Sequence, residues 1–205
     1  LDVITIGKLF ETGKFDPVRT IALTGPEVKE PKYYKVRTGE NIQHIIEDNI
    51  KEGKVRYISG NVLSGKQITK DGFLGFYDYQ ITVIPEGDQP ELFGWASPGF
   101  DKFSVARTFF TWLQPKRKWR ISSNTHGGER PFVITGEYDK VLPMNILPVH
   151  LLKAIIIEDI DLMEQLGIYE VAEEDFALCE FVCTSKIEVQ SIIRKGINVM
   201  IREFS

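Results

Sequence analysis

The sequence has 205 residues, of which 42% are hydrophobic and 26% charged, so the chain is long and apolar enough to bury a real core. Its 25 basic and 29 acidic residues leave a net charge of −4, which argues against a general affinity for nucleic acid. The composition excludes collagenous, disordered and disulfide-rich classes. No apolar run approaches the roughly 20 residues that span a bilayer, which predicts a soluble chain that can still be peripheral to a membrane assembly.

The start of the chain, Leu1 to Ile4, has neither an initiator methionine nor the basic region of a signal peptide. We therefore expect a fragment of a longer protein. Two cysteines do not form a disulfide framework, so a reducing, cytoplasmic setting is expected.

The charge is unevenly distributed along the sequence. Residues 1–100 carry a net charge of −2, residues 101–150 carry +4, and residues 151–205 carry −6. A basic middle beside an acidic end indicates three sections with different surroundings.

The first section has the pattern of a mixed α/β module. Apolar residues from Val3 to Phe10 recur at helical spacing, and Gly13 is suited to end that helix. A short helix is expected over residues 42–46. Strands are predicted at 19–24, 32–36, 55–59, 73–76 and 80–84. A strand and a short helix followed by several strands favour a β-grasp fold.

The rest of the sequence begins with the turn-rich stretch 87–99 and ends in helices. Pro148 suits the first turn of a helix, and Gly167 suits the end of a helix over 159–166. The remaining elements expected are a helix over 103–113, a loop over 121–130, a strand over 131–135 and a last helix over 187–201.

Residues Gly60 to Lys66 match the first seven positions of a phosphate-binding P-loop, and they follow a predicted strand. The eighth position should carry Ser or Thr to hold magnesium, but Gln67 stands there. The residues after it are poor helix formers, so no helix N-terminus would face a phosphate. The pattern favours two turn glycines between strands.

The histidines provide no metal or catalytic motif. His44, His126 and His150 are scattered, and no H-E-x-x-H pair occurs. The run from His126 to Gly128 is similar to an oxyanion-hole loop, but no G-x-S-x-G motif accompanies it, so a glycine turn is favoured. We therefore assign no catalytic, cofactor-binding or metal-binding residues.

The stretch Lys116 to Arg120 is the one basic cluster, and it contains Trp119. A solvated loop is its plainest interpretation. The alternatives are an electrostatic contact with an acidic partner subunit or with anionic lipid headgroups. Nucleic acid comes third, because nothing else in the sequence supports it.

Cys179 and Cys183 have the C-x3-C spacing that ends a bacterial ferredoxin run. Thr184 stands where Pro is expected, and the two upstream ligand positions hold Glu173 and Phe176. Phe176 cannot bind iron, and two thiolates cannot hold a four-iron cluster alone. Buried apolar cysteines are favoured.

With these residues in view, the chain resembles the C-terminal half of the A subunit of the sodium-translocating NADH:quinone oxidoreductases of bacterial membranes. The resemblance covers nearly all 205 residues. The matching segments are 6–10, 22–26, 28–29, 57–60, 62–65, 92–95, 101–104, 124–130, 141–144, 146–148 and, close to a family signature, 173–179 with 182–183.

That family is similar to the C subunit of the ferredoxin–NAD reductase (Rnf) complex and to the flavin subunit of complex I. The resemblance implies an α+β chain in four parts: 1–28, the tail of a truncated Rossmann-like domain; 29–100, a ubiquitin-like β-grasp (SLBB-type) module; 101–144, a connecting region with the basic cluster; and 145–205, a small helical domain resembling a degenerate two-cluster ferredoxin. The stretch 136–148, where the first cluster would bind, contains no cysteine.

The resemblance also implies a function. The complex is an oxidoreductase and translocase that passes electrons from NADH to quinone and exports sodium, using flavins and iron–sulfur centres. This fragment is expected to hold no cofactor, to be non-catalytic by itself, and to dock with the other subunits at the cytoplasmic face of the membrane. A contribution to quinone interaction is the active alternative. A free-standing β-grasp ligand-binding module is the alternative outside the family.

Overall fold

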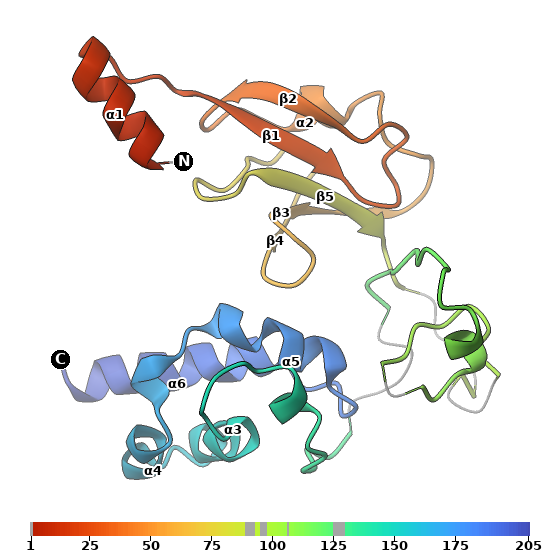
Figure 1. Ribbon diagram of the computed structural model, residues 1–205, viewed down its shortest axis with the longest axis vertical. Coiled ribbons are helices and arrows are strands. Elements are labelled where there is room, and N and C mark those ends of the chain that lie inside the picture. Colours follow the sequence, from red (N-terminus) through yellow and green to blue (C-terminus); the bar gives the residue numbers. More distant parts are fainter. Residues whose placement is uncertain (1, 89–92, 95–97, 106, 125–129) are drawn as a thin grey trace. The chain divides into compact units, whose positions relative to one another are not determined.

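The chain divides into two units, and each of them is built from two separate stretches of sequence. The computed structural model describes residues 2–88, 93–94, 98–105, 107–124 and 130–205 (Figure 1). Unit 1 consists of residues 1–88 and 120–124, and unit 2 of residues 89–119 and 125–205. The chain therefore leaves unit 1 after Asp88 and returns to it at Arg120.

Unit 1 contains a mixed sheet with strand order β2-β1-β5-β3-β4. The first and last strands, β1 and β5, lie side by side and parallel, and every other neighbouring pair is antiparallel. The strands are β1 (Val18–Thr24), β2 (Lys32–Arg37), β3 (Val55–Ser59), β4 (Lys66–Ile68) and β5 (Gln80–Pro85). The predicted strands at 19–24, 32–36, 55–59 and 80–84 are confirmed, because their β-branched residues supply the buried face.

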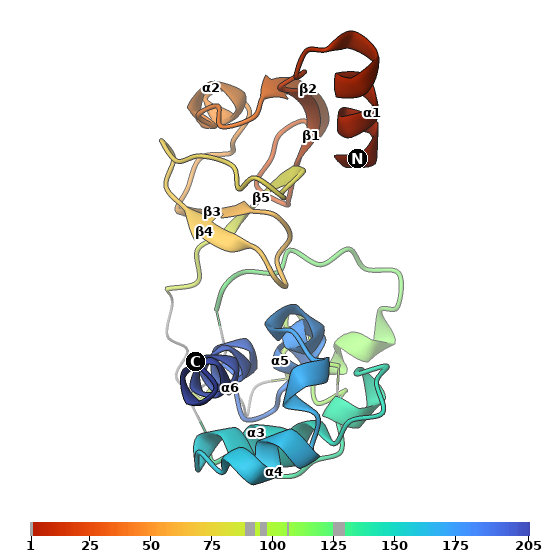
Figure 2. The same cartoon turned by 90° about the vertical axis from the view of Figure 1, so that its left-hand side faces the viewer.

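The short helix α2 (Gln43–Ile46) covers one face of this sheet (Figure 2). Ile42, Ile45 and Ile46 are buried and belong to the same core cluster as Leu23 of β1 and Val83 of β5. The helix predicted over 42–46 is thus confirmed. A mixed five-stranded sheet covered by a helix is consistent with an SLBB-type β-grasp module.

One predicted strand, at 73–76, is wrong. Phe73 forms only an isolated bridge with Asn41, and the chain then turns. The turn is tight, because a Cβ at Gly75 would lie 2.4 Å from a carboxylate oxygen of Asp78. The three-residue strand β4, by contrast, was not predicted, since it is too short and too polar to show an alternating pattern.

Helix α1 (Asp2–Thr12) precedes the sheet in unit 1, as predicted. It ends where Gly13 takes a φ of +67° and donates its backbone N–H to the Leu9 carbonyl. None of its residues is buried, and its apolar side chains, including Val3, Ile6 and Phe10, are exposed.

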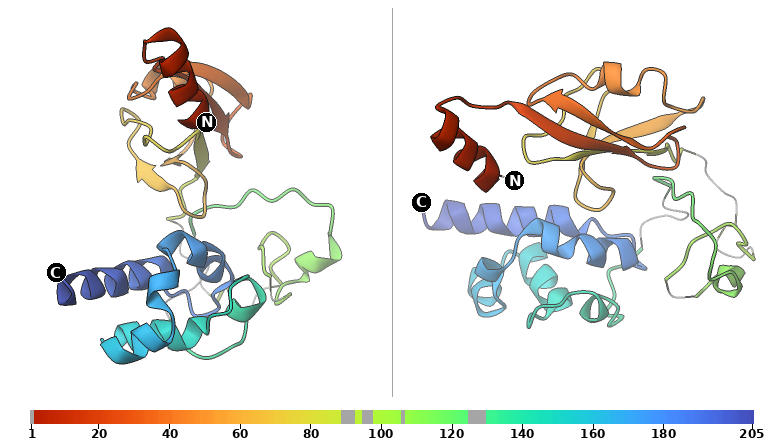
Figure 3. Two further views of the ribbon diagram at one scale, coloured as in Figure 1. Left: turned by 60° about the vertical axis from the view of Figure 1, so that its left-hand side comes forward. Right: turned by 45° about the horizontal axis from the view of Figure 1, so that its top comes forward.

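The described part of unit 2 contains four α-helices, of which the longest, α6, packs against α3 and α5 (Figure 3). They are α3 (Pro148–Ile156), α4 (Ile160–Gln165), α5 (Ala177–Val182) and α6 (Val189–Glu203), with 3-10 turns η1 (Phe110–Leu113), η2 (Tyr138–Lys140), η3 (Ile168–Glu170) and η4 (Glu173–Phe176). Helices α3 and α6 approach closely at Gly196, where a Cβ would lie 2.8 Å from the Ile155 side chain. The helices predicted from Pro148, over 159–166 and over 187–201 are confirmed, whereas α5 was not foreseen.

Two other predictions in unit 2 are wrong. The described residues of 103–113 form no α-helix: Arg107 has a φ of +55°, which no right-handed helix accommodates, and among them only η1 is helical. Residues 131–135 form no strand. The start of this stretch is instead bonded to Ser185, whose hydroxyl donates to the Pro131 carbonyl and whose carbonyl accepts from the Arg130 N–H.

Candidate docking site

The P-loop-like residues Gly60 to Lys66 form the turn between β3 and β4. The side-chain oxygen of Asn61 accepts hydrogen bonds from the backbone N–H groups of Leu63 and Ser64, at 2.7 and 2.9 Å. Gly65 donates its N–H to the Asn61 carbonyl. The N–H groups that would bind a phosphate in a P-loop are thus used within the turn, and the interpretation as turn glycines between strands is confirmed.

The two described histidines, His44 and His150, belong to different units. His44 of α2 lies 3.5 Å from Glu40, which precedes that helix, and His150 is exposed on α3. The glycine turn expected at 126–128 lies outside the described residues. Within the part of the chain that the structure describes, no group of three or more His, Cys, Asp or Glu side chains could hold a metal ion.

The two cysteines are free thiols buried in the core of unit 2. Burial, reinforced by the charge of Asp139, raises the pKa of Cys179 to about 11. Cys183 follows α5 and accepts hydrogen bonds from the Tyr138 hydroxyl at 2.8 Å and from the Ile187 N–H at 3.4 Å. Because the thiolate is the form that binds metals, a neutral buried thiol is a packing group. The interpretation as buried cysteines is confirmed.

The two upstream positions of the ferredoxin-like run have structural partners of their own. Glu173 forms an ion pair with Arg194 of α6. Phe176 is fully buried in the helical core. Side-chain packing thus occupies the positions at which a ferredoxin would present ligands.

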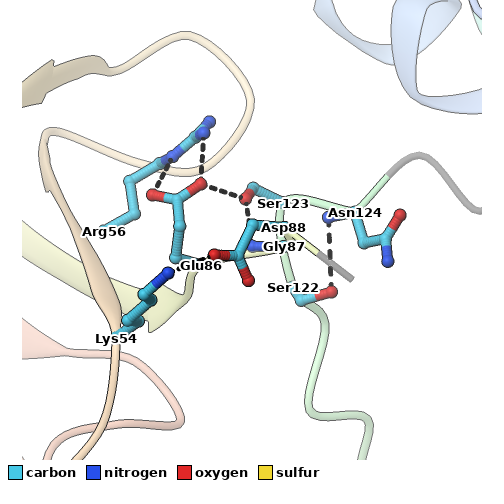
Figure 4. Close-up of polar contacts among 8 residues, drawn as sticks. All are labelled: Lys54, Arg56, Glu86, Gly87, Asp88, Ser122, Ser123 and Asn124. Atoms are coloured by element: carbon cyan, nitrogen blue, oxygen red, sulfur yellow. Dashed lines mark hydrogen bonds and ion pairs between the residues drawn. The ribbon is translucent and has the colours of Figure 1, made fainter. Parts of the chain in front are cut away.

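A group of polar contacts holds residues 120–124 against the end of β5, and we call it the polar clamp (Figure 4). Glu86 lies at its centre, accepting hydrogen bonds from the guanidinium of Arg56 at 3.1 and 2.6 Å and from the hydroxyl of Ser123 at 2.8 Å. Ser123 in turn accepts from the Gly87 N–H at 2.7 Å. A Cβ at Gly87 would lie 2.0 Å from the Asn124 nitrogen, so glycine permits this close approach. The hydrogen bonds from Arg56 and Ser123 lower the pKa of Glu86.

A second contact fastens the start of the same stretch. Glu27 is only 2% exposed, and it accepts a hydrogen bond of 2.6 Å from Arg120. This bond lowers the pKa of the Glu27 carboxyl, against the opposing effect of burial. Residues 27 and 120 lie far apart in sequence, so this contact returns the chain to unit 1 at the last residue of the basic cluster.

The polar clamp predicts how single substitutions act. Replacing Ser123 by alanine removes both the acceptor of the Gly87 N–H and a donor to Glu86. We expect the free energy of unfolding of unit 1 to fall by about 1–2 kcal/mol and the Gly87 amide to exchange faster with solvent. Hydrogen exchange followed by mass spectrometry measures both.

Ser122→Ala is the matched control, because Ser122 only accepts one longer bond of 3.3 Å, from the Asn124 N–H. Equal exchange rates at the Gly87 amide in the two variants would show that the Ser123 hydroxyl does not stabilise this contact.

Stability should also depend on pH. The pKa values of the Glu27 and Glu86 carboxyls are lowered from 4.5 in the folded protein. Their contribution to the free energy of unfolding is therefore complete above pH 4.5 and is lost as the pH falls through the lowered pKa values.

The basic residues of the cluster 116–120 divide into arginines that are paired within the chain and lysines that are not. Arg117 pairs with Asp101 and donates to the Phe100 carbonyl at 2.8 Å, and Arg120 pairs with Glu27. Lys116 and Lys118 are exposed, and neither forms an ion pair or hydrogen bond with any described residue. The two lysines, and not the whole cluster, are therefore the candidates for contact with a partner.

Residues 20–70 match the family described as the NQRA C-terminal domain. The resemblance to the A subunits of the sodium-translocating reductases is confirmed. The chain is 47% identical over 204 residues to the A subunit of the Na(+)-translocating NADH-quinone reductase of Rhodopirellula baltica, covering 98% of this chain and 45% of the relative. The corresponding protein of Haemophilus influenzae (strain ATCC 51907 / DSM 11121 / KW20 / Rd) is 43% identical over the same shares, and that of Yersinia pestis bv. Antiqua (strain Angola) is 42% identical over 94% of this chain and 43% of the relative.

The chain thus spans a little under half the length of the relatives it matches. Among the described residues, no helix is long and apolar enough to cross a membrane.

Proposed function

We propose that this chain is the C-terminal half of the A subunit of a sodium-translocating NADH:quinone reductase. Its role there is to dock and position parts of the complex at the cytoplasmic face of the membrane, while electron transfer from NADH to quinone takes place elsewhere in the complex. The observation that carries the proposal is the similarity to such an A subunit over 98% of the chain, at 47% identity.

The interior of unit 2 supports a docking role rather than an electron-carrying one. The positions of the ferredoxin-like run hold a buried thiol of raised pKa, a thiol bonded to Tyr138, an ion-paired carboxylate and a core phenylalanine. Each of these side chains stabilises the packing of helices. None is left as an available ligand for a redox centre.

We propose further that the stretch before β1, which includes helix α1, continues the Rossmann-like domain of the longer subunit. Strand β1 pairs with β2 and β5, so the β-grasp module begins at β1 and not at residue 29. The connecting region (101–144) and the helical domain (145–205) follow that module. Helix α1 supports this assignment, because it buries none of its own residues and exposes Val3, Ile6 and Phe10. An amphipathic helix of this kind gains stability only when another element covers its apolar face.

The test uses the full-length A subunit that contains this sequence, tagged and produced with the other subunits of the reductase. We expect it to recover those subunits together with NADH:quinone activity. The double variant Cys179→Ala, Cys183→Ser is expected to leave complex yield, iron content and turnover unchanged. Failure of the wild-type protein to recover the other subunits would refute the proposed membership, and loss of iron or turnover at normal yield would refute the docking role.

A further inference from the structure

The segment 98–119 of unit 2 combines exposed aromatic residues with positive charge, and we call it the aromatic–basic segment. It contains five basic residues and a single acidic one, Asp101, whereas the chain as a whole is acidic. Asp101 is neutralised by Arg117. The Lys102 side chain is buried and donates to the Gly94 carbonyl at 2.7 Å. The outward positive charge of the segment therefore comes from Arg107, Lys116 and Lys118, which are all exposed.

Large apolar side chains lie close to these lysines along the chain. Phe110, Trp112 and Leu113 of the turn η1 are exposed by 51, 52 and 61%. Phe110 packs against Phe100, which is itself exposed, with ring centroids 6.0 Å apart. Exposed apolar groups gathered in this way are typical of a surface that is covered in the working protein.

The segment is held in place rather than loose. The Phe103 ring lies 5.5 Å, between centroids, from both Trp119 and Phe181 of α5. The buried hydroxyl of Thr111, within η1, donates to the Lys102 carbonyl at 2.9 Å. The backbone that carries the exposed side chains is thus fixed by these contacts. Less conformational entropy is therefore lost when the segment binds a partner.

The choice of cation distinguishes between two kinds of partner. Protein interfaces are enriched in Arg and depleted in Lys. Here Arg117 and Arg120 are paired within the chain, and two of the three outward cations of the segment are lysines. A lysine is a hydrated point charge on a flexible stem, which suits phosphate headgroups that present no fixed geometry. Tryptophan and phenylalanine beside such lysines are typical of residues that enter the lipid–water interface.

We propose that the aromatic–basic segment binds an anionic phospholipid surface. Lys116 and Lys118 contact the headgroups, and Phe110, Trp112 and Leu113 enter the interface beneath them. This inference deepens the proposed function, on which it rests, by naming lipid as one surface to which the protein docks.

The test is co-sedimentation of the 205-residue chain with vesicles of phosphatidylcholine alone or mixed with phosphatidylglycerol. We expect binding to the anionic vesicles that weakens as salt is added, because salt screens the lysine charges. The variant Lys116→Glu, Lys118→Glu is expected to lower the partition coefficient at least about tenfold, since each lysine near an anionic surface contributes to binding. Trp112→Ser with Leu113→Ser is expected to lower it as well.

Lys66→Glu with Lys70→Glu is the matched control, because it changes the net charge equally at exposed lysines of unit 1. Binding reduced equally by both charge reversals would overturn the proposal, as would equal binding to neutral vesicles. If the chain binds no vesicles but Lys116→Glu, Lys118→Glu lowers the yield of the complex, the segment contacts an acidic protein instead. That result would refute the lipid proposal and leave the proposed function standing. Vesicle binding without recovery of the other subunits would instead refute only the proposed function.

Discussion

Alanine in place of Gly25 is expected to destabilise unit 1 by about 3–5 kcal/mol. Gly25 follows β1, has a φ of +118°, and passes so close to β5 that a Cβ would lie 2.1 Å from the Val83 carbonyl oxygen. That oxygen belongs to the backbone of a central strand and cannot move aside without breaking the sheet. Alanine would therefore suffer both a strained φ and a backbone clash.

Hydrogen exchange at the amides of β1 and β5 is the appropriate measurement, because it reports these strands directly, whereas all three tryptophans belong to unit 2. A loss of about 3 kcal/mol corresponds to a protection at least about 100-fold lower. Gly39→Ala is the matched control: its φ is +81°, but nothing lies within 4 Å of the added Cβ. It is expected to cost only the about 1–2 kcal/mol of the backbone strain. Equal effects in the two variants would show that strain alone, and not contact with β5, requires glycine at position 25.

The elements of unit 1 could be predicted because their signals are local. The runs that form β1, β3 and β5 contain β-branched residues, and turn residues bound them. The order of the strands in the sheet depends on pairing between residues distant in sequence. The succession of elements in the sequence favours a β-grasp fold but does not specify that order.

The secondary structure of the connecting region (101–144) could not be predicted from local signals. Its aromatic residues at 103–113 have a spacing compatible with a helix, but the structure uses Phe103 to pack on Trp119 and Phe181 instead. Tertiary packing therefore overrides a weak local preference. The strand expected at 131–135 failed for a related reason, since no partner strand pairs with it in the described part of unit 2.

The polar clamp and the division of the basic cluster also lay beyond sequence reasoning. Glu86 and Ser123 are 37 residues apart, and Glu27 and Arg120 are 93 apart. Sequence periodicity indicates only neighbours within one helix or strand, so it cannot show which of these distant side chains meet. Only the folded chain separates the paired arginines of the cluster from the outward lysines, and that separation turns a general electrostatic hypothesis into a specific one.

Truncation of Phe176 to alanine is expected to cost unit 2 about 3–5 kcal/mol, because it opens a cavity in a fully packed core. Phe176 ends η4 immediately before α5, and it is 0% exposed in the core cluster that also contains Leu152 and Ile193. Tryptophan fluorescence during urea unfolding reports this unit, since Trp119 contacts Phe103, which contacts Phe181 of α5. The midpoint should shift to lower urea, with protection at β1 and β5 unchanged.

Phe204→Ala provides the comparison, since the Phe204 side chain is 65% exposed at the end of α6 and should contribute no more than about 0.5 kcal/mol. The contrast bears on function because position 176 is where a ferredoxin-like run would place an iron ligand. If Phe176→Ala costs several kcal/mol, hydrophobic packing performs the cross-linking of helices that a cluster performs in a ferredoxin. A cost as small as that of Phe204→Ala would mean that this core is not what holds α3, α5 and α6 together, and the docking role would lose its structural basis.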